Sequence, residues 1–273
     1  LQLLRRESSR IPAYSRSHDA SLQDLNIVDG QDLIPVDTPA ASELQRAVAP
    51  FFKTGKPVLA LGGDQSITIP LLRAAKEVHG DFAIIHIDKD LAMGSGSREE
   101  GLAPGSALYW AAAASLVDTR HSLHVGLRGN LPSKRVELID QELGFKSILA
   151  EDFAFHSVQH VVQQVKDRLE RRDGTFMPAY ISLDLDVLDP MFVPATGDSN
   201  SEVGGLSVLE LRALLVGLKS FCRVVGADLR GAAALLEPPS AVRVAATLAH
   251  DLVLLAGRQH LLGTHVVPPP LKT

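Results

Sequence analysis

Short apolar runs that end in glycine or acidic residues alternate along the chain with longer segments whose apolar residues recur at helical spacing. The apolar runs predict strands, because buried parallel strands read as continuous apolar segments. Strands are expected in the segments 25–29, 57–66, 82–90, 122–127, 147–149, 180–190 and 223–229. Helices are expected over 1–9, 42–52, 69–78, 106–116, 134–143, 158–171, 207–218 and 242–255, and residues 11–21 are expected to be irregular. Strands that alternate with helices predict an α/β fold, a parallel sheet with helices on both faces.

The sequence is expected to form a single domain over residues 1–273. Its length allows one large α/β domain or two small ones, but no internal repeat and no linker divides it. The first residues, Leu1–Glu7, read as a helix cut in its middle and lack an initiator methionine, so we expect a truncated N-terminus. The proline-rich tail at 266–270 is expected to be extended.

Composition and charge narrow the class of protein. The hydrophobic share of 45% and the charged share of 22% are ordinary for a soluble globular chain. A formal net charge of −5 without any basic stretch argues against a nucleic-acid partner, and we find no apolar run that would span a membrane. The single cysteine, Cys222, is typical of a reducing compartment, so we expect a cytoplasmic or mitochondrial protein and leave a removed targeting peptide open.

The segment 180–190 is the first candidate for chemistry. Residues two apart in a strand point to the same face, so Asp184 and Asp186 are expected to project together before Pro190 stops the strand. Two adjacent carboxylates repel each other unless a cation or a proton lies between them, and carboxylate oxygens suit manganese or magnesium. The alternative is a strand end whose acids are simply solvated.

Other strand ends strengthen the metal hypothesis. In open parallel sheets ligands bind beyond the carboxyl ends of the strands. Five side chains are predicted to meet there: Gln65, Asp88, Asp90, Asp184 and Asp186.

At this point the residues resemble the ureohydrolase family, which holds arginase, agmatinase, guanidinobutyrase and formimidoylglutamase. Ser182–Pro190 reproduces the Ser-x-Asp-x-Asp-x-x-Asp-Pro signature of that family. Leu61–Thr68 looks like its Gly-Gly-Asp-His-Ser segment, and Ile85–Ala92 stands where it has Asp-Ala-His-x-Asp. Val125–Gly129 is similar to the agmatinase branch. The resemblance covers nearly the whole chain and implies a three-layer α/β/α sandwich that assembles as trimers or hexamers.

The resemblance also implies a chemistry, the hydrolysis of a guanidinium group to urea by a water that two manganese ions bridge and deprotonate. The family holds the manganese pair with two histidines and four aspartates. Carried over residue by residue, this chain keeps three of the six, Asp88, Asp184 and Asp186. The two histidines and the remaining aspartate stand here as Gln65, Asp90 and Ala92. We therefore expect a degenerate metal site at Asp88, Asp90, Asp184, Asp186 and Gln65, with manganese at low occupancy or no cofactor.

The catalytic positions depart from the family as well. Its proton-shuttling histidine falls at Pro104 and its guanidinium-binding glutamate at Leu235, so we name no catalytic residue. Lys89 is expected either to place an ammonium among the acids or to extend to solvent. Arg230 is expected to repel a cationic substrate. Asp189 is expected to cap the turn around Pro190.

Two hypotheses follow. The first is an agmatinase-like homologue that has lost the manganese centre and activity and acts as a pseudoenzyme or as a regulatory or binding subunit. Its partners would be further copies of the chain or an active paralogue, with no nucleic acid and no membrane. The alternative is an active guanidino hydrolase that uses a rewired, aspartate-rich metal site.

One set of substitutions tests whether only the ligands were lost. Replacing Gln65→His, Asp90→His and Ala92→Asp together rebuilds the family's six donors, so manganese binding should return, as metal analysis of the purified variant would show. Hydrolysis need not return, because Pro104 and Leu235 remain. A variant that takes up no metal would mean that something else at the site has also changed.

Overall fold

The computed structural model describes residues 2–33, 41–94, 105–194, 202–231 and 239–261, with side chains as far as residue 257. Its centre is a six-stranded sheet in the order β3-β8-β7-β4-β5-β6, and every neighbouring pair is parallel. The strands are β3 (Val58–Leu61), β4 (Ala83–Ile87), β5 (Leu123–Leu127), β6 (Lys146–Leu149), β7 (Ala179–Asp184) and β8 (Val224–Arg230). The predicted parallel sheet is confirmed, and its order places β8, β7 and β4 side by side in the middle.

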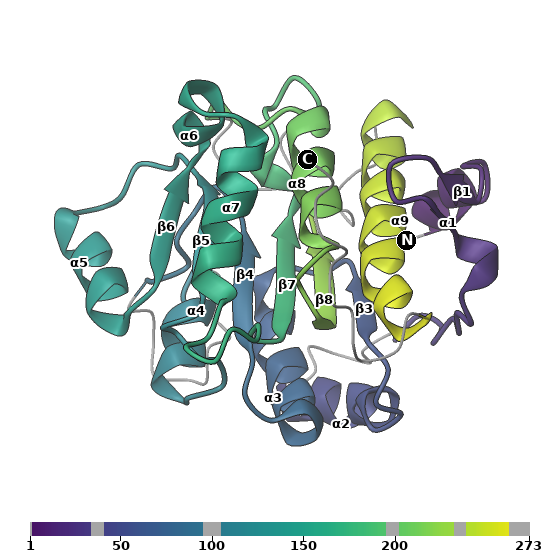
Figure 1. The fold of residues 1–273 in the computed structure, drawn as a ribbon, viewed down its shortest axis with the longest axis horizontal. Helices are drawn as coiled ribbons and strands as arrows, with labels where there is room; N and C mark the ends of the chain where they lie inside the picture. The colour runs from purple at the N-terminus through teal and green to yellow at the C-terminus, as the bar shows by residue number, and fades with distance from the viewer. Residues whose placement is uncertain (1, 34–40, 95–104, 195–201, 232–238, 262–273) are drawn as a thin grey trace.

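Helices cover both faces of the sheet, so the protein is a three-layer α/β/α sandwich (Figure 1). One face is covered by α7 (Val158–Leu169), α8 (Val208–Leu218) and α9 (Pro239–Leu261). The other face is covered by α2 (Ala41–Phe52), α3 (Thr68–His79) and α4 (Ala107–Ala113). The remaining helices are α1 (Gln2–Ser8), which packs on α9, and α5 (Lys134–Leu143) and α6 (Ala150–Phe155), which lie toward β6 (Figure 1).

Local sequence explains where several helices begin and end. The Ser207 hydroxyl accepts a hydrogen bond from the Glu210 amide, and the Glu210 carboxylate accepts one from the Ser207 amide, so the two residues form a capping box at the start of α8. Ser157 caps α7 in the same way through the His160 amide. Gly144, at a φ of 94°, ends α5 in the left-handed region that favours glycine.

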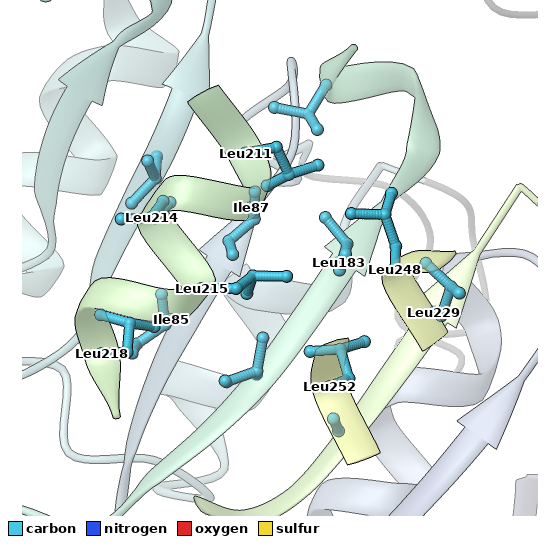
Figure 2. Packing of buried hydrophobic residues seen from close by; sticks show 14 of the residues in the cluster. Ile85, Ile87, Leu183, Leu211, Leu214, Leu215, Leu218, Leu229, Leu248 and Leu252 are labelled. Carbon is cyan, nitrogen blue, oxygen red and sulfur yellow. The ribbon is translucent and has the colours of Figure 1, made fainter. Parts of the chain in front are cut away.

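Side chains that alternate along the strands build two cores, one on each face of the sheet. Ile85, Ile87 and Leu183 point toward α8 and α9, where they contact leucines of both helices (Figure 2). Ile84 and Tyr180 point to the opposite face, toward α2, α3 and α4. Because both faces are covered, these strands are apolar at most positions, as the sequence pattern indicated.

Helix α9 also passes a simple membrane test. The window Pro239–Gly257 is long and apolar enough to cross a bilayer by length and composition, contrary to our reading of the sequence. However, 61% of that window is buried inside the protein, where α9 packs on α8, β8 and α1. Its apolar character is that of a core helix.

The structure corrects four details of the sequence prediction. Residues 25–29 form no strand, since Leu25 ends the 3₁₀ turn η1 (Leu22–Asp24) and the next residues find no partner strand. A two-residue hairpin, β1 (Tyr14–Ser15) with β2 (Ala20–Ser21), lies within the segment expected to be irregular. Helix α6 was not predicted, and β7 ends at Asp184. The tail at 266–270 lies outside the described residues.

The packing predicts the effect of truncating a core side chain. Leu215→Ala, on the buried face of α8, should lower the free energy of unfolding by about 2–5 kcal/mol because it leaves a cavity against the sheet. Urea denaturation followed by circular dichroism measures this loss. Leu209→Ala on the same helix is the matched control, since Leu209 is 77% exposed and should change stability by less than about 0.5 kcal/mol. Equal losses in the two variants would contradict the assignment of the buried face.

Candidate functional site

The carboxyl ends of β4, β7 and β8 bring three charged side chains to one level of the sheet. Asp184, the last residue of β7, pairs in register with Arg230, the last residue of β8. Asp88 follows Ile87, which pairs with Leu183, so Asp88 is level with Asp184 on the other side. All three residues therefore lie at or just beyond the carboxyl ends of neighbouring strands, at the edge where parallel sheets bind ligands.

A third aspartate joins them through a turn. Beyond Asp184 the chain forms the 3₁₀ turn η3 (Leu185–Val187), in which the Asp184 carboxylate accepts a hydrogen bond of 3.0 Å from the Asp186 amide. Asp88, Asp184 and Asp186 then offer one carboxylate oxygen each, all within 4.8 Å of one another. The predicted convergence of Asp184 and Asp186 is present, but the turn produces it rather than the two-residue repeat of a strand.

Arg230 fills the space between the acids. Its Nη2 lies 2.9 Å from Oδ2 of Asp88, its Nη1 3.3 Å from Oδ2 of Asp184, and its Nε 3.1 Å from Oδ1 of Asp228. The Arg230 side chain is only 2% exposed, and Asp228 is fully buried, with its Oδ1 also accepting a hydrogen bond from the Ser182 hydroxyl. A buried guanidinium is thus surrounded by three carboxylates.

The charges in this pocket shift one another's pKa values. Burial raises the pKa of Asp186 to about 10, and the charges of Asp88 and Asp184 act in the same direction. Burial also raises the pKa of Asp184, although the Arg230 guanidinium lowers it. Burial disfavours the ionised form of Asp88, but His86 and Arg230 hold its pKa below the usual range. Burial opposes the charge on Arg230 too, but Asp184 and the other carboxylates raise its pKa further, so it stays a cation.

A buried histidine pair supports the pocket from behind. Burial lowers the pKa of His86 to about 4, so its ring is neutral at pH 7. His86 Nδ1 lies 2.9 Å from Nδ1 of His124, and His124 Nε2 lies 3.0 Å from Oδ1 of Asp140. A carboxylate only accepts, so His124 Nε2 donates to Asp140. The remaining nitrogen of His86, Nε2, lies 3.1 Å from Oδ2 of Asp88 and 3.4 Å from Nη2 of Arg230.

Two predicted metal ligands contact partners other than the three aspartates. Gln65 is buried, but its Oε1 accepts a hydrogen bond of 2.9 Å from the Gly105 amide and its Nε2 lies 3.4 Å from His86 Nε2. The Asp90 side chain is 50% exposed and pairs with the Lys89 ammonium at 3.0 Å. Sequence position alone grouped both with the aspartates, whereas the structure gives the Gln65 oxygen and the Asp90 carboxylate other partners.

Lys89 does not extend to solvent. Its side chain is 7% exposed, and its Nζ lies 3.0 Å from Asp90 and 3.5 Å from Glu202. Burial opposes its charge, but Asp90 and Asp186 raise its pKa. The ammonium therefore neutralises acids at the edge of the pocket, next to the three aspartates.

The remaining predicted positions fall into two groups. Pro104 and Leu235 lie outside the described residues. Asp189 forms the predicted cap, since its carboxylate accepts hydrogen bonds from the amides of Met191, Gly204 and Gly205. Backbone hydrogen bonds, that of Met191 first, lower the pKa of Asp189, so it stays an ionised capping group.

Arg128 holds the turn that carries Asp186. Its guanidinium donates to the carbonyl oxygens of Asp186, Val187 and Leu188 over 2.8–3.2 Å and to the carbonyl of Glu202 at 3.1 Å. This arginine was noted in the sequence only for its likeness to the agmatinase branch, and no local signal indicated that it binds main-chain oxygens across 60 residues.

The residues present do not fit a pair of divalent cations. Ala92 offers no donor atom, Asp90 lies at the surface, and the oxygen of Gln65 is already hydrogen-bonded. The Oδ2 atoms of Asp88 and Asp184 already bind the Arg230 guanidinium. At an effective dielectric constant of about 20, a divalent cation about 4 Å from that guanidinium would be repelled by about 8 kcal/mol.

The chain is similar to known proteins of one family. A model described as the arginase family matches residues 2–255. An agmatinase of Klebsiella pneumoniae is 32% identical over 235 residues, which cover 85% of this chain and 71% of that protein. A putative agmatinase 3 of Schizosaccharomyces pombe is 37% identical over 179 residues, 63% of this chain and 42% of that protein. The chain therefore spans less than half the length of this yeast relative.

Solved structures share the fold. A proclavaminate amidino hydrolase from Streptomyces clavuligerus superposes with a TM-score of 0.83 at 26% identity, over 95% of this chain and 85% of that one. An agmatine ureohydrolase of Thermoplasma volcanium gives a TM-score of 0.77 at 20% identity, over 96% and 84%. The second likeness concerns the fold alone.

The histidine pair yields a prediction. Asp140→Ala should lower the free energy of unfolding by about 1–3 kcal/mol, because His124 Nε2 then has a buried donor without a partner. Chemical denaturation at pH 7 measures the loss. Glu137→Ala, at an exposed position of the same helix, should change stability by less than about 0.5 kcal/mol. If both variants were equally stable, Asp140 would not be supporting the histidine.

Proposed function

Because the chain belongs to the arginase family, we propose that it is an agmatinase-like homologue that has lost the binuclear manganese centre and the hydrolysis of guanidino compounds. In this proposal it acts as a pseudoenzyme, a binding or regulatory subunit. Membership rests on the match over residues 2–255 and on the agmatinase that is 32% identical. The proposed loss of activity rests on the site.

The donor set is the observation that carries the proposal. Of the six positions at which the resemblance implies manganese ligands, only Asp88, Asp184 and Asp186 bring carboxylates together. Two manganese ions that share a hydroxide need donors on both sides of the pair. Three carboxylates, two of them bound to a guanidinium, are too few donors to hold both ions.

An active hydrolase with a rewired site is the second candidate. The observation in its favour is that Asp88, Asp184 and Asp186 lie close enough to hold one ion. One divalent ion could polarise a guanidinium or lower the pKa of a water. The chain would then have to supply a proton acceptor and a substrate-binding carboxylate from residues other than those at Pro104 and Leu235.

The proposed assembly follows from the family, and the proposed location from the single cysteine. Ureohydrolases are commonly oligomeric, so we propose a homo-oligomer of three or six copies or co-assembly with an active paralogue. In an assembly with an active paralogue, this chain would act as a regulatory subunit that changes the activity of its partner without supplying an active site of its own. The cytoplasm or the mitochondrion is the proposed compartment.

Metal content and urea release separate the two functions. Protein purified with manganese present should carry less than about a tenth of an equivalent per chain, against about two for an active binuclear enzyme. Neither agmatine nor arginine should yield urea above a blank, while an active agmatinase assayed in parallel does. One equivalent of manganese together with urea release would instead establish the rewired hydrolase.

A further inference from the structure

The structure gives the Arg230 side chain a different surrounding from the one that the sequence predicted. It was expected to repel a cationic substrate, but its side chain is 2% exposed and lies among the acids. β8 ends at Arg230, in register with Asp184, so the side chain enters the pocket at the level of Asp88 and Asp184. It therefore occupies the centre of the pocket and not its edge.

The donors of this guanidinium are nearly all in use. Nε contacts Asp228 at 3.1 Å, Nη1 contacts Asp184 at 3.3 Å, and Nη2 contacts Asp88 at 2.9 Å and His86 Nε2 at 3.4 Å. Each of its three nitrogens thus has a carboxylate partner inside the pocket. Because these nitrogens already face carboxylates, a substrate-binding role does not suit this arginine.

Arg230 also takes the same atoms that a metal would need. The Oδ2 atoms that it binds belong to Asp88 and Asp184, two of the three aspartates that could hold an ion. A metal ion could bind one of these oxygens only by lying close to the guanidinium that the oxygen already binds. The repulsion between the two positive charges is strong in a buried site. Guanidinium and metal therefore compete for the pocket.

We propose that the Arg230 guanidinium is the resident cation of this pocket, in the place of the metal ions of active relatives, and that it closes the pocket to divalent metal by itself. The inference rests on the proposed loss of the metal centre and supplies a cause for it. Rebuilding the family's ligands is then not enough. The triple substitution described above should fail to recover manganese as long as Arg230 remains.

The first experiment compares two rebuilt chains of full length. The triple variant Gln65→His, Asp90→His, Ala92→Asp is prepared with and without Arg230→Met, and bound manganese is counted after gel filtration. Methionine fills a similar volume without charge. We expect the triple variant to stay below about a tenth of an equivalent and the quadruple variant to hold at least about one, a tenfold gain. Equal manganese in the two variants would overturn the proposal.

The second experiment uses thermal unfolding and needs no rebuilt ligands. Wild type should unfold at the same temperature in EDTA and in manganese. Arg230→Met should unfold at lower temperature in EDTA and recover several degrees in about 1 mM manganese chloride, because the uncompensated acids then bind the ion. Arg230→Lys keeps a cation and should show no such recovery. An Arg230→Met variant that is folded and indifferent to manganese would contradict the proposal.

Arg212→Met is the matched control. Arg212 also pairs with a buried aspartate, Asp251, at 2.7 Å, but between α8 and α9 and away from the pocket. This variant should lose stability without any response to manganese. A manganese response equal to that of Arg230→Met would mean that removing any paired arginine exposes acids to metal, and the proposal would fail.

The outcomes also distinguish this inference from the proposed function. If wild type itself holds two manganese ions and releases urea, the proposed function fails. If wild type binds none but the quadruple variant gains none over the triple variant, the proposed function stands and the role of Arg230 fails. If Arg230→Met does not fold, the triple variant decides alone, since at least one equivalent of manganese bound beside Arg230 would overturn the proposal and its absence supports it.

Discussion

The site depends on one electrostatic constraint, the need for positive charge among acids that end neighbouring strands. Asp88 follows β4, Asp184 ends β7, and Asp228 lies within β8, two residues before Arg230. Removing carboxylates from water is costly unless a partner compensates. Arg230 supplies that partner from within the sheet and stays a cation. Burial raises the pKa of Asp186 to about 10, so its carboxyl holds a proton at pH 7 and adds no negative charge. Breaking a buried ion pair of this kind commonly costs about 3–5 kcal/mol, so these groups contribute to the fold as well as to the site.

The sheet separates two tasks between its faces. Odd-numbered residues of β4 and β7, such as Ile85 and Leu183, pack under α8 and α9 and hold the strands in place (Figure 2). Even-numbered residues change along each strand from apolar, such as Ile84, to polar, such as His86 and Asp88. A rigid apolar core on one face thus fixes the relative positions of the charged groups on the other, which is why their distances are set by strand register and not by flexible loops.

The sequence predicted the architecture because the relevant signals are local. Apolar runs and helical spacing gave the alternation of strands and helices, and the signature at Ser182–Pro190 located the aspartates. Short segments were less predictable: residues 25–29 have strand composition but no partner strand. The role of Arg230 depends on the pairing of β8 with β7, 46 residues away in the chain at Asp184, and that pairing leaves no trace in the residues around either strand. The sequence around Asp90 likewise does not show that its side chain pairs with Lys89 and faces solvent instead of joining the other acids.

An arginine that is part of the chain differs from a metal ion in one further respect. A bound ion leaves when the surrounding solution is depleted of it, and proteins whose folds require ions inherit that dependence. A guanidinium attached through the backbone has no dissociation step, because it is present at the same effective concentration in every molecule. In the role that we propose for Arg230, its pairing with Asp88, Asp184 and Asp228 would uncouple folding of this chain from the manganese supply of the cell, and newly made copies would need no step of metal delivery.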